Sequence, residues 1–157
     1  MDIDSEKFDE IVAKGEILYK DFQVVRCPYF GGEVHFNSHG LEHLKFKRRG
    51  RARSVHDQYM RFKLLHLAPE VLTLSKTVQG IWHTKHFERV RIHSRTDTIL
   101  KDVSYYEFIA VLHQVRVKVV VKQIDDGQKF FWSIIPFWGV NKETQNRKMY
   151  GGNPEED

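Results

Sequence analysis

The hydrophobic pattern predicts an α+β fold, in which N-terminal helices pack on a roughly four-stranded antiparallel β-sheet. Before Gly80 the longer apolar patterns recur at the helical period, and after it the period shifts towards two. Asp125-Asp126-Gly127 separates the last two alternating runs and predicts a hairpin turn. Helices followed by a run of strands are typical of α+β domains, because α/β domains alternate the two elements.

The first half of the chain predicts three helices and two short strands. The helices are expected from Ser5 to about Tyr19, from Ser38 to Phe46, and from Ser54 to about Thr77. Ser5 and Ser38 are the expected caps, and Pro69 should end or kink the third helix. The short strands are expected over Phe22 to Arg26 and Glu33 to Asn37, on either side of Pro28 and the Gly31-Gly32 turn.

The second half predicts four strands, His86 to His93, Tyr105 to His113, Val115 to Gln123 and Lys129 to Pro136. Within the third of them valines occupy the odd positions, while the even positions carry Arg116, Lys118 and Lys122. Successive side chains of a strand point to opposite faces, so one face is expected in the core and the other is expected to be cationic.

Composition predicts one globular domain. The chain has 157 residues, of which 41% are apolar and 13% aromatic, with a formal net charge of +4. Residues 1–140 are expected to form the domain, and the polar residues 141–157 a flexible tail. Cys27 is the single cysteine, which excludes an internal disulfide and favours a cytoplasmic protein. The acidic N-terminus lacks the order of a signal peptide, and no apolar run approaches the ~20 residues of a membrane helix.

Histidines and basic residues are concentrated between Val34 and Lys63. From Lys45 to Lys63 the chain carries eight Lys or Arg and one acid, Asp57. Such a patch attracts polyanions, above all nucleic acid, and arginine suits bidentate phosphate contacts. The residues expected to contact nucleic acid here are Lys45, Lys47, Arg48, Arg49, Arg51 and Arg61. The alternatives are a solvated basic loop and a surface for an acidic protein partner.

His39 and His43 would share one face of the predicted helix, because they are four residues apart. Histidine exchanges protons near neutral pH, so the pair is a candidate for acid–base catalysis or phosphate contact. A metal site and a surface pair without function are the alternatives. The order H-G-L-E-H differs from the H-E-x-x-H of zinc peptidases, and no carboxylate cluster suggests a two-metal nuclease. We therefore expect neither a metal nor a cofactor.

The predicted sheet adds a second group of candidates. Arg116, Lys118 and Lys122 lie on one strand, and Trp132 and Ser133 on the next. An exposed tryptophan can stack on an unpaired base, and a serine hydroxyl can hold a phosphate. The alternative is that the apolar run around Trp132 is simply core.

Two segments resemble the phage- and mobile-element-encoded nuclease domains of the barnase–EndoU–colicin–RelE-like superfamily. They are Tyr29-Phe30-Gly31-Gly32-Glu33-Val34-His35-Phe36 with His39-Gly40-Leu41-Glu42-His43-Leu44, and Val117 to Lys122 with Gly127 to Pro136. The resemblance spans roughly residues 28–138 and implies a single nuclease-like domain with helices packed on a four-stranded antiparallel sheet. It also implies RNA cleavage without metal, by attack of a 2′-hydroxyl that leaves a 2′,3′-cyclic phosphate.

The resemblance also implies catalytic residues. They are His43 with His39 as the nearby alternative, Arg53 or Arg51, Lys122 on the sheet, and Ser133 on the last strand. The leading hypothesis is a toxin-like, metal-independent endoribonuclease acting on tRNA, mRNA or rRNA, with an acidic antitoxin or immunity protein as a possible partner. A non-catalytic nucleic-acid-binding or regulatory protein using the basic patch at residues 45–63 is the second hypothesis. A metal enzyme using His39, His43 and a later histidine is the third.

Overall fold

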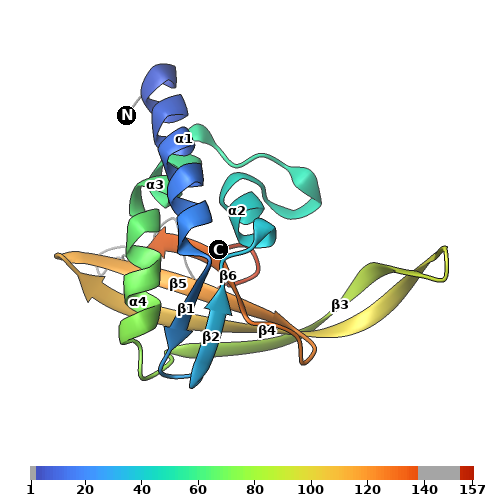
Figure 1. Ribbon diagram of the computed structural model, residues 1–157. Coiled ribbons are helices and arrows are strands. Elements are labelled where there is room, and N and C mark those ends of the chain that lie inside the picture. The colour runs from blue at the N-terminus through green and yellow to red at the C-terminus, as the bar shows by residue number, and fades with distance from the viewer. Residues whose placement is uncertain (1–2, 138–152) are drawn as a thin grey trace, which may run out of the picture.

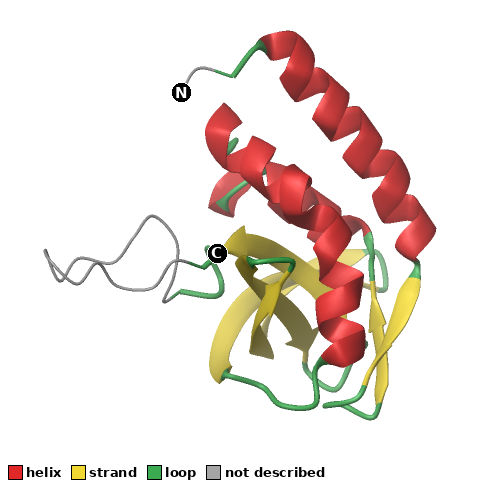
Figure 2. Ribbon diagram, turned by 90° about the vertical axis from the view of Figure 1, so that its left-hand side faces the viewer, coloured by secondary structure: helices red, strands yellow, loops and turns green. Residues whose placement is uncertain are grey.

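The computed structural model, which describes residues 3–137 and 153–157, has an α+β architecture with helices gathered on one side of a β-sheet (Figures 1 and 2). The α-helices are α1 (Ser5–Phe22), α2 (Ser38–Lys45), α3 (Val55–Leu64) and α4 (Ala68–Leu74), with short 3₁₀ turns at Arg48–Gly50 and Leu65–Leu67. The strands are β1 (Val24–Cys27), β2 (Gly32–His35), β3 (Gly80–Ile92), β4 (Arg95–Leu112), β5 (Val115–Ile124) and β6 (Phe130–Pro136).

The sheet has six strands in the order β1-β2-β6-β5-β4-β3, so the predicted number of four is wrong. Both N-terminal strands were expected from the sequence, but not their place in the same sheet. They join it through one parallel contact, in which the His35 backbone N–H donates to the Lys129 carbonyl at 2.9 Å. The other neighbouring strands are antiparallel, as predicted. A parallel pairing this short leaves no periodic signal in the sequence.

The β3–β4 hairpin is longer than the sequence predicted. His93 and Ser94 both have positive φ, 47° and 66°, which is the conformation of a two-residue type I′ loop. Neither residue is a strong turn signal, so the sequence did not predict a turn here. Without that turn, the continuous pairing of β3 with β4 was not predicted either. Since β5 pairs with β4 only from Val103 onwards, the outer parts of β3 and β4 extend past the other described strands as a two-stranded arm (Figure 1).

The predicted helix from Ser54 to Thr77 is divided into α3, a 3₁₀ turn and α4. Pro69 lies in the first turn of α4, where its missing N–H costs nothing, and its ring prevents α3 from continuing. The prediction that Pro69 ends or kinks this helix is therefore confirmed. None of the described helices is both long and apolar enough to cross a membrane.

Helix α2 is placed by a close approach to β6. Its cap is Asn37, whose side chain accepts from the backbone N–H groups of His39 and Gly40 at 3.1 and 3.3 Å, in place of the predicted Ser38. A Cβ atom at Gly40 would overlap the Phe131 carbonyl oxygen and the Tyr19 hydroxyl. Glycine thus lets α2 lie directly on β6, which brings His43 to the sheet.

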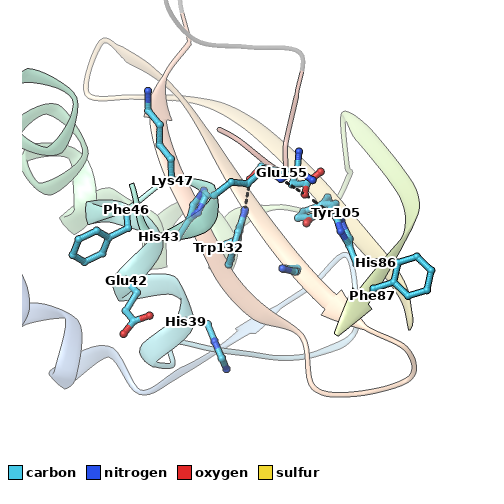
Figure 3. A pocket seen from close by; sticks show the side chains of 13 residues that line it. His39, Glu42, His43, Phe46, Lys47, His86, Phe87, Tyr105, Trp132 and Glu155 are labelled. Carbon is cyan, nitrogen blue, oxygen red and sulfur yellow. Dashed lines mark hydrogen bonds and ion pairs between the residues drawn. The ribbon is translucent and has the colours of Figure 1, made fainter. Parts of the chain in front are cut away.

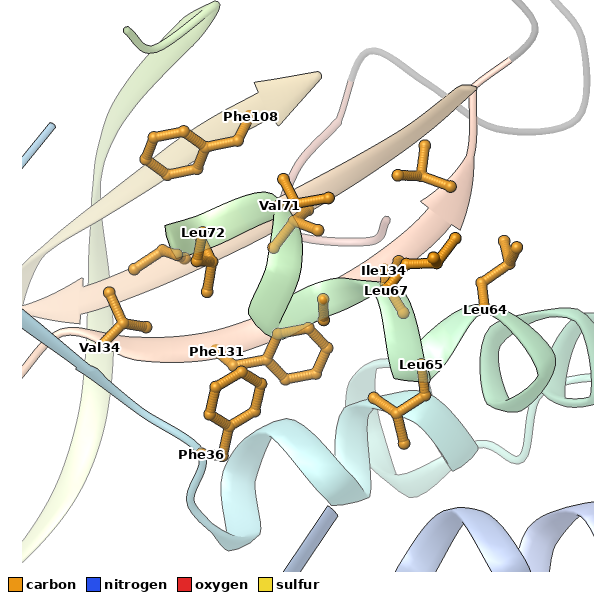
Figure 4. Packing of buried hydrophobic residues seen from close by; sticks show 14 of the residues in the cluster. Val34, Phe36, Leu64, Leu65, Leu67, Val71, Leu72, Phe108, Phe131 and Ile134 are labelled. Atoms are coloured by element: carbon orange, nitrogen blue, oxygen red, sulfur yellow. The ribbon is translucent and has the colours of Figure 1, made fainter. Parts of the chain in front are cut away.

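The main core lies between the helices and one face of the sheet. Val71 and Leu72 of α4 pack there with Phe108 and Phe131 of the strands (Figure 4). Val120, on the opposite face of β5 from Val119 and Val121, belongs to a second cluster with Val103, Tyr105, Ile124 and Trp132. The second face of β5 is therefore buried at Lys118 and Val120, so the expectation of one core face and one cationic face does not hold there.

Candidate functional site

A group of buried polar side chains lies where α2 and α3 meet the sheet. It consists of His43, Arg53, Asp57, Arg61, Glu107, Lys118 and Ser133, each no more than 9% exposed, and is called the buried basic cluster below. Removing several charged groups from water is costly unless each finds a partner. Strongly buried ionisable groups of this kind are concentrated at functional sites.

Two arginines of the cluster are held by one carboxylate. Arg53, Asp57 and Arg61 follow one another at intervals of four residues, which places them on one side of α3 and its entry. Arg53 Nη1 lies 3.3 Å from Asp57 Oδ2, and Arg61 Nε lies 2.7 Å from Asp57 Oδ1. Asp57 thus fixes both guanidinium groups, and other N–H donors of Arg53 are directed at His43 of α2 while Nη1 of Arg61 is directed at Ser133 of β6.

Arg53 also holds His43. Its Nε donates to the His43 carbonyl oxygen at 2.8 Å, and its Nη2 lies 3.0 Å from His43 Nε2. Arginine can only donate, so this contact requires the tautomer with an unprotonated Nε2. The His43 ring stacks on Trp132 with 3.8 Å between ring centroids, and Lys122 Nζ lies 4.0 Å from the centre of the same indole ring.

Lys118 approaches the cluster from β5. Its Nζ donates to Glu107 Oε2 at 2.7 Å and to Asp157 Oδ2 at 2.6 Å. The second oxygen of Glu107 accepts from Trp82 Nε1 at 2.7 Å. The lysine is 1% exposed, so these two carboxylates supply the charge compensation that water cannot.

Residues 153–157, called the C-terminal segment below, cover the cluster. The main-chain oxygen of Asp157 accepts from Ser133 Oγ at 2.6 Å and from Arg61 Nη1, and it lies 3.2 Å from His43 Nε2. Ser133 Oγ in turn accepts from Arg61 at 2.5 Å. The main-chain oxygens of Glu156 and Glu155 accept from Arg53 Nη2 at 3.1 Å and Trp132 Nε1 at 3.3 Å.

The expected flexible tail, 141–157, is therefore packed over its last five residues. The driving force is the set of buried donors, which need acceptors once they leave water. Residues 141–152 lie outside the described part of the chain.

An open pocket of about 460 Å³ adjoins the cluster. His43 and Trp132 form one wall, while His86 and Phe87 of β3 contribute to another (Figure 3). Glu155 reaches across it, with its Oε1 3.3 Å from His86 Nε2 and 3.4 Å from Arg48 Nε.

The structure brings together seven of the residues predicted from the sequence. Each of them contacts another of the seven or the C-terminal segment: His43, Arg53, Arg61, Lys118, Lys122, Trp132 and Ser133. His39, Lys47 and Arg48 line the pocket.

Other predicted residues lie apart from the cluster. Lys45 pairs with Glu16 of α1, and Arg51 is exposed. Arg116 is exposed near the start of β5, and the side chain of Arg49 is outside the described part of the structure. The basic stretch at residues 45–63 therefore divides into a buried part and an exposed loop.

The sequence interpretation missed Asp57 and Glu107 as members of the site, and it left open whether the acidic end of the chain, Glu155 to Asp157, covers the basic residues. Asp57 carried a usable signal, since it lies four residues from an arginine on either side. Glu107 and Asp157 reach Lys118 from distant parts of the chain, and no local pattern predicts such contacts. Among the described residues, no three His, Cys, Asp or Glu side chains gather as a metal site would require.

Burial sets the protonation of the site. Burial, with Arg53 and Arg61 nearby, lowers the pKa of His43 to about 2, so its ring is neutral at physiological pH. Burial and Arg61 lower the pKa of Arg53 to about 10, against the opposing effect of Asp57, and the guanidinium stays protonated. His43 as it lies here accepts from Arg53 and is too weakly basic to take up a proton.

We expect stability to fall as His43 is forced to bind a proton. The pKa of His43 is about 2 in the folded protein and about 6.5 in an unfolded chain. The contribution of the neutral ring to the free energy of unfolding is therefore present above pH 6.5 and is lost as the pH falls below that value. Between pH 7 and pH 5 the loss should be about 2 kcal/mol. Urea unfolding at both pH values measures it, and His43→Gln should remove this part of the pH dependence. The exposed His39→Gln control should retain it, and equal pH dependence in all three proteins would contradict the assignment.

Comparison with models of known protein families, with curated proteins and with solved structures finds no match to this chain. The functional argument therefore depends on the residues of the site and their geometry.

Proposed function

We propose that the chain is a metal-independent endoribonuclease and that the buried basic cluster is its phosphate site. The observation that carries the proposal is the convergence of donors on one oxygen. Arg61 Nη1 and Ser133 Oγ both donate to the main-chain oxygen of Asp157, with His43 Nε2 3.2 Å from it. Donors prearranged around an acceptor in a water-poor site are what a charged transition state requires.

A phosphate oxygen in the place of that main-chain oxygen would receive the same donors. Arg53 and Lys118 add positive charge near it, because they donate to the Glu156 main-chain oxygen and to an Asp157 side-chain oxygen. Trp132 lines the pocket beside the cluster, and its ring stacks on His43. An unpaired base could stack on it only by displacing the Lys122 side chain from over the ring. Lys122 lies over the same ring and would contact the backbone of a bound strand.

The proposed reaction is transesterification within the RNA. A base removes the proton of a 2′-hydroxyl, the 2′-oxygen forms a bond to the adjacent phosphorus, and the bond from phosphorus to the 5′-oxygen breaks. An acid gives a proton to that leaving oxygen, and the products are a 2′,3′-cyclic phosphate and a 5′-hydroxyl. His43 and His39 are the candidates for these two roles. A bound phosphate would raise the pKa of His43, because a nearby negative charge stabilises the protonated ring.

End-labelled RNA incubated in EDTA tests the proposal. The wild-type chain should give fragments with cyclic phosphate ends, and His39→Ala combined with His43→Ala should slow cleavage about a hundredfold. A matched RNA with 2′-O-methyl groups throughout should stay intact, because it has no nucleophile. Wild-type cleavage of the methylated RNA would refute the mechanism, and undiminished cleavage by the double variant would refute the roles of the histidines.

A nucleic-acid-binding protein without catalysis is the second candidate. The observation that favours it is the low pKa of His43, which keeps the buried imidazole neutral at physiological pH and without the second proton that an acid catalyst gives up. In that case the cluster binds phosphate and the histidines only position it. RNA that is retarded on a gel by the wild-type protein but never cut would support this alternative.

A further inference from the structure

The acceptors of the C-terminal segment occupy the buried basic cluster as a ligand would. Four of its contacts are made by main-chain oxygens or by the last carboxylate, on Arg53, Arg61, Ser133 and Lys118. Main-chain oxygens are available from any residue, so little in the cluster is specific for these particular side chains. What the cluster selects is a set of closely spaced oxygen acceptors, at least one of them negatively charged.

The net charge of the buried side chains favours an anionic ligand. Arg53, Arg61 and Lys118 are cationic, whereas Asp57 and Glu107 supply the carboxylates that come from the folded core. Asp157 is the third carboxylate, and it comes from the C-terminal segment. Without it these five groups carry one excess positive charge. A phosphodiester brings negative charge and several closely spaced acceptor oxygens, which are the features that the segment presents to the cluster.

The fit of the segment at His43 is incomplete. His43 Nε2 lies 3.0 Å from the donor Arg53 Nη2 and 3.2 Å from the acceptor oxygen of Asp157. A neutral nitrogen can accept from the first or donate to the second, but not both at once. While Arg53 donates to this nitrogen, the Asp157 oxygen receives no hydrogen bond from it, so the segment leaves one of its contacts unmet.

The segment also spans the adjoining pocket. Glu155 lies near both Arg48 and His86, and its main-chain oxygen receives the indole N–H of Trp132 (Figure 3). The same short stretch therefore covers the cluster and the aromatic wall beside it. A nucleic acid strand that placed a phosphate in the cluster and a base on Trp132 would need both positions.

We propose that the C-terminal segment is a built-in competitor of RNA, which occupies the phosphate site with its own oxygens and must leave before a strand can bind. This inference rests on the proposed function and adds its regulation. Binding and cleavage are then both limited by the fraction of molecules in which the segment is displaced. Anything that draws the segment away, such as a basic partner surface, raises the activity without touching the catalytic residues.

The first measurement uses a fluorescein-labelled, fully 2′-O-methylated RNA, which reports binding without cleavage. Asp157→Lys places a cation against Lys118 and should expel the segment. The Kd of this variant for the methylated RNA should therefore be at least about tenfold lower than the Kd of the wild type. Asp9→Lys, on the exposed surface of α1, makes the same change in net charge and should alter Kd no more than about twofold. Equal affinities for the two variants would overturn the inference.

The second measurement needs no substitution. The Trp132 indole N–H donates to Glu155, so its proton resonance in the wild type reports whether the segment is in place. Saturation with the methylated RNA should shift this resonance and release the amides of residues 155–157 from protection. Binding that leaves all of these signals unchanged would overturn the inference while leaving the nuclease proposal intact. Failure of every variant to bind or cut RNA would overturn both.

Discussion

An Arg61→Met variant should cut RNA at least about a thousandfold more slowly than the wild type. Arg61 donates to the oxygen position on which the proposed site converges, and it also donates to Ser133, which shares that position. Loss of one preorganised donor costs two to three orders of magnitude in rate, and a catalytic arginine contributes as much or more, roughly a thousandfold upwards. Single-turnover cleavage of end-labelled RNA in EDTA measures the effect.

Two matched variants separate chemistry from folding. Arg61→Lys keeps a cation beside Asp57 and should preserve more stability than Arg61→Met, but the shorter, non-planar donor should recover little of the rate. Arg116→Met removes an exposed arginine of β5 that lies apart from the cluster, and it should leave the rate within about threefold of the wild type. Folded Arg61→Met protein that cuts within tenfold of the wild type would contradict the assignment of this residue.

A Lys118→Met variant should lose about 3–5 kcal/mol of unfolding free energy. The lysine is buried between Glu107 and Asp157, and its removal leaves two carboxylates inside the protein without their cation. The side chains are of similar length, so the loss reflects charge more than volume. Urea unfolding monitored by circular dichroism at pH 7 gives the difference.

A second substitution tests the cause. Glu107→Gln in the Lys118→Met background removes one of the stranded charges while keeping an acceptor for Trp82, and it should recover about 1 kcal/mol or more. Lys85→Met is the control. Lys85 of β3 forms an exposed ion pair with Asp102 of β4, and this pair should contribute about 1 kcal/mol at most to the free energy of unfolding. No recovery in the double variant would show that packing, not charge, sets the loss.

The helices and turns that depend on nearby residues were predicted from apolar spacing, proline and turn residues. The spacing of Phe8, Ile11 and Val12 is enough to predict α1, and Pro69 is enough to predict the break after α3. The hairpin at Asp125 to Gly127 follows from turn residues. The turn at His93 and Ser94 was missed because these residues adopt positive φ without the glycine or asparagine that usually marks it.

Composition also anticipated several members of the site but not their environment. His43 and Ser133 were chosen for their chemistry and Arg53 from the family resemblance, and the three residues lie together. Lys118 was expected on a solvent-facing strand surface and is instead buried, because β4 and the C-terminal segment bring carboxylates to it. The pKa of His43 likewise depends on burial and on arginines that only the fold places beside it.

The sequence by itself determined the α+β class, most helix and strand positions, and the concentration of cations in the middle of the chain. These depend on periodicity, turn residues and composition, which act over a few residues. Only the tertiary structure decided that the sheet has six strands, that Asp57 and Glu107 belong to the site, and that residues 153–157 cover it. Apart from the contact of Asp57 within α3, these contacts join residues that are far apart in sequence. Buried charges need partners, but the sequence alone does not show which residues the fold brings within reach of them.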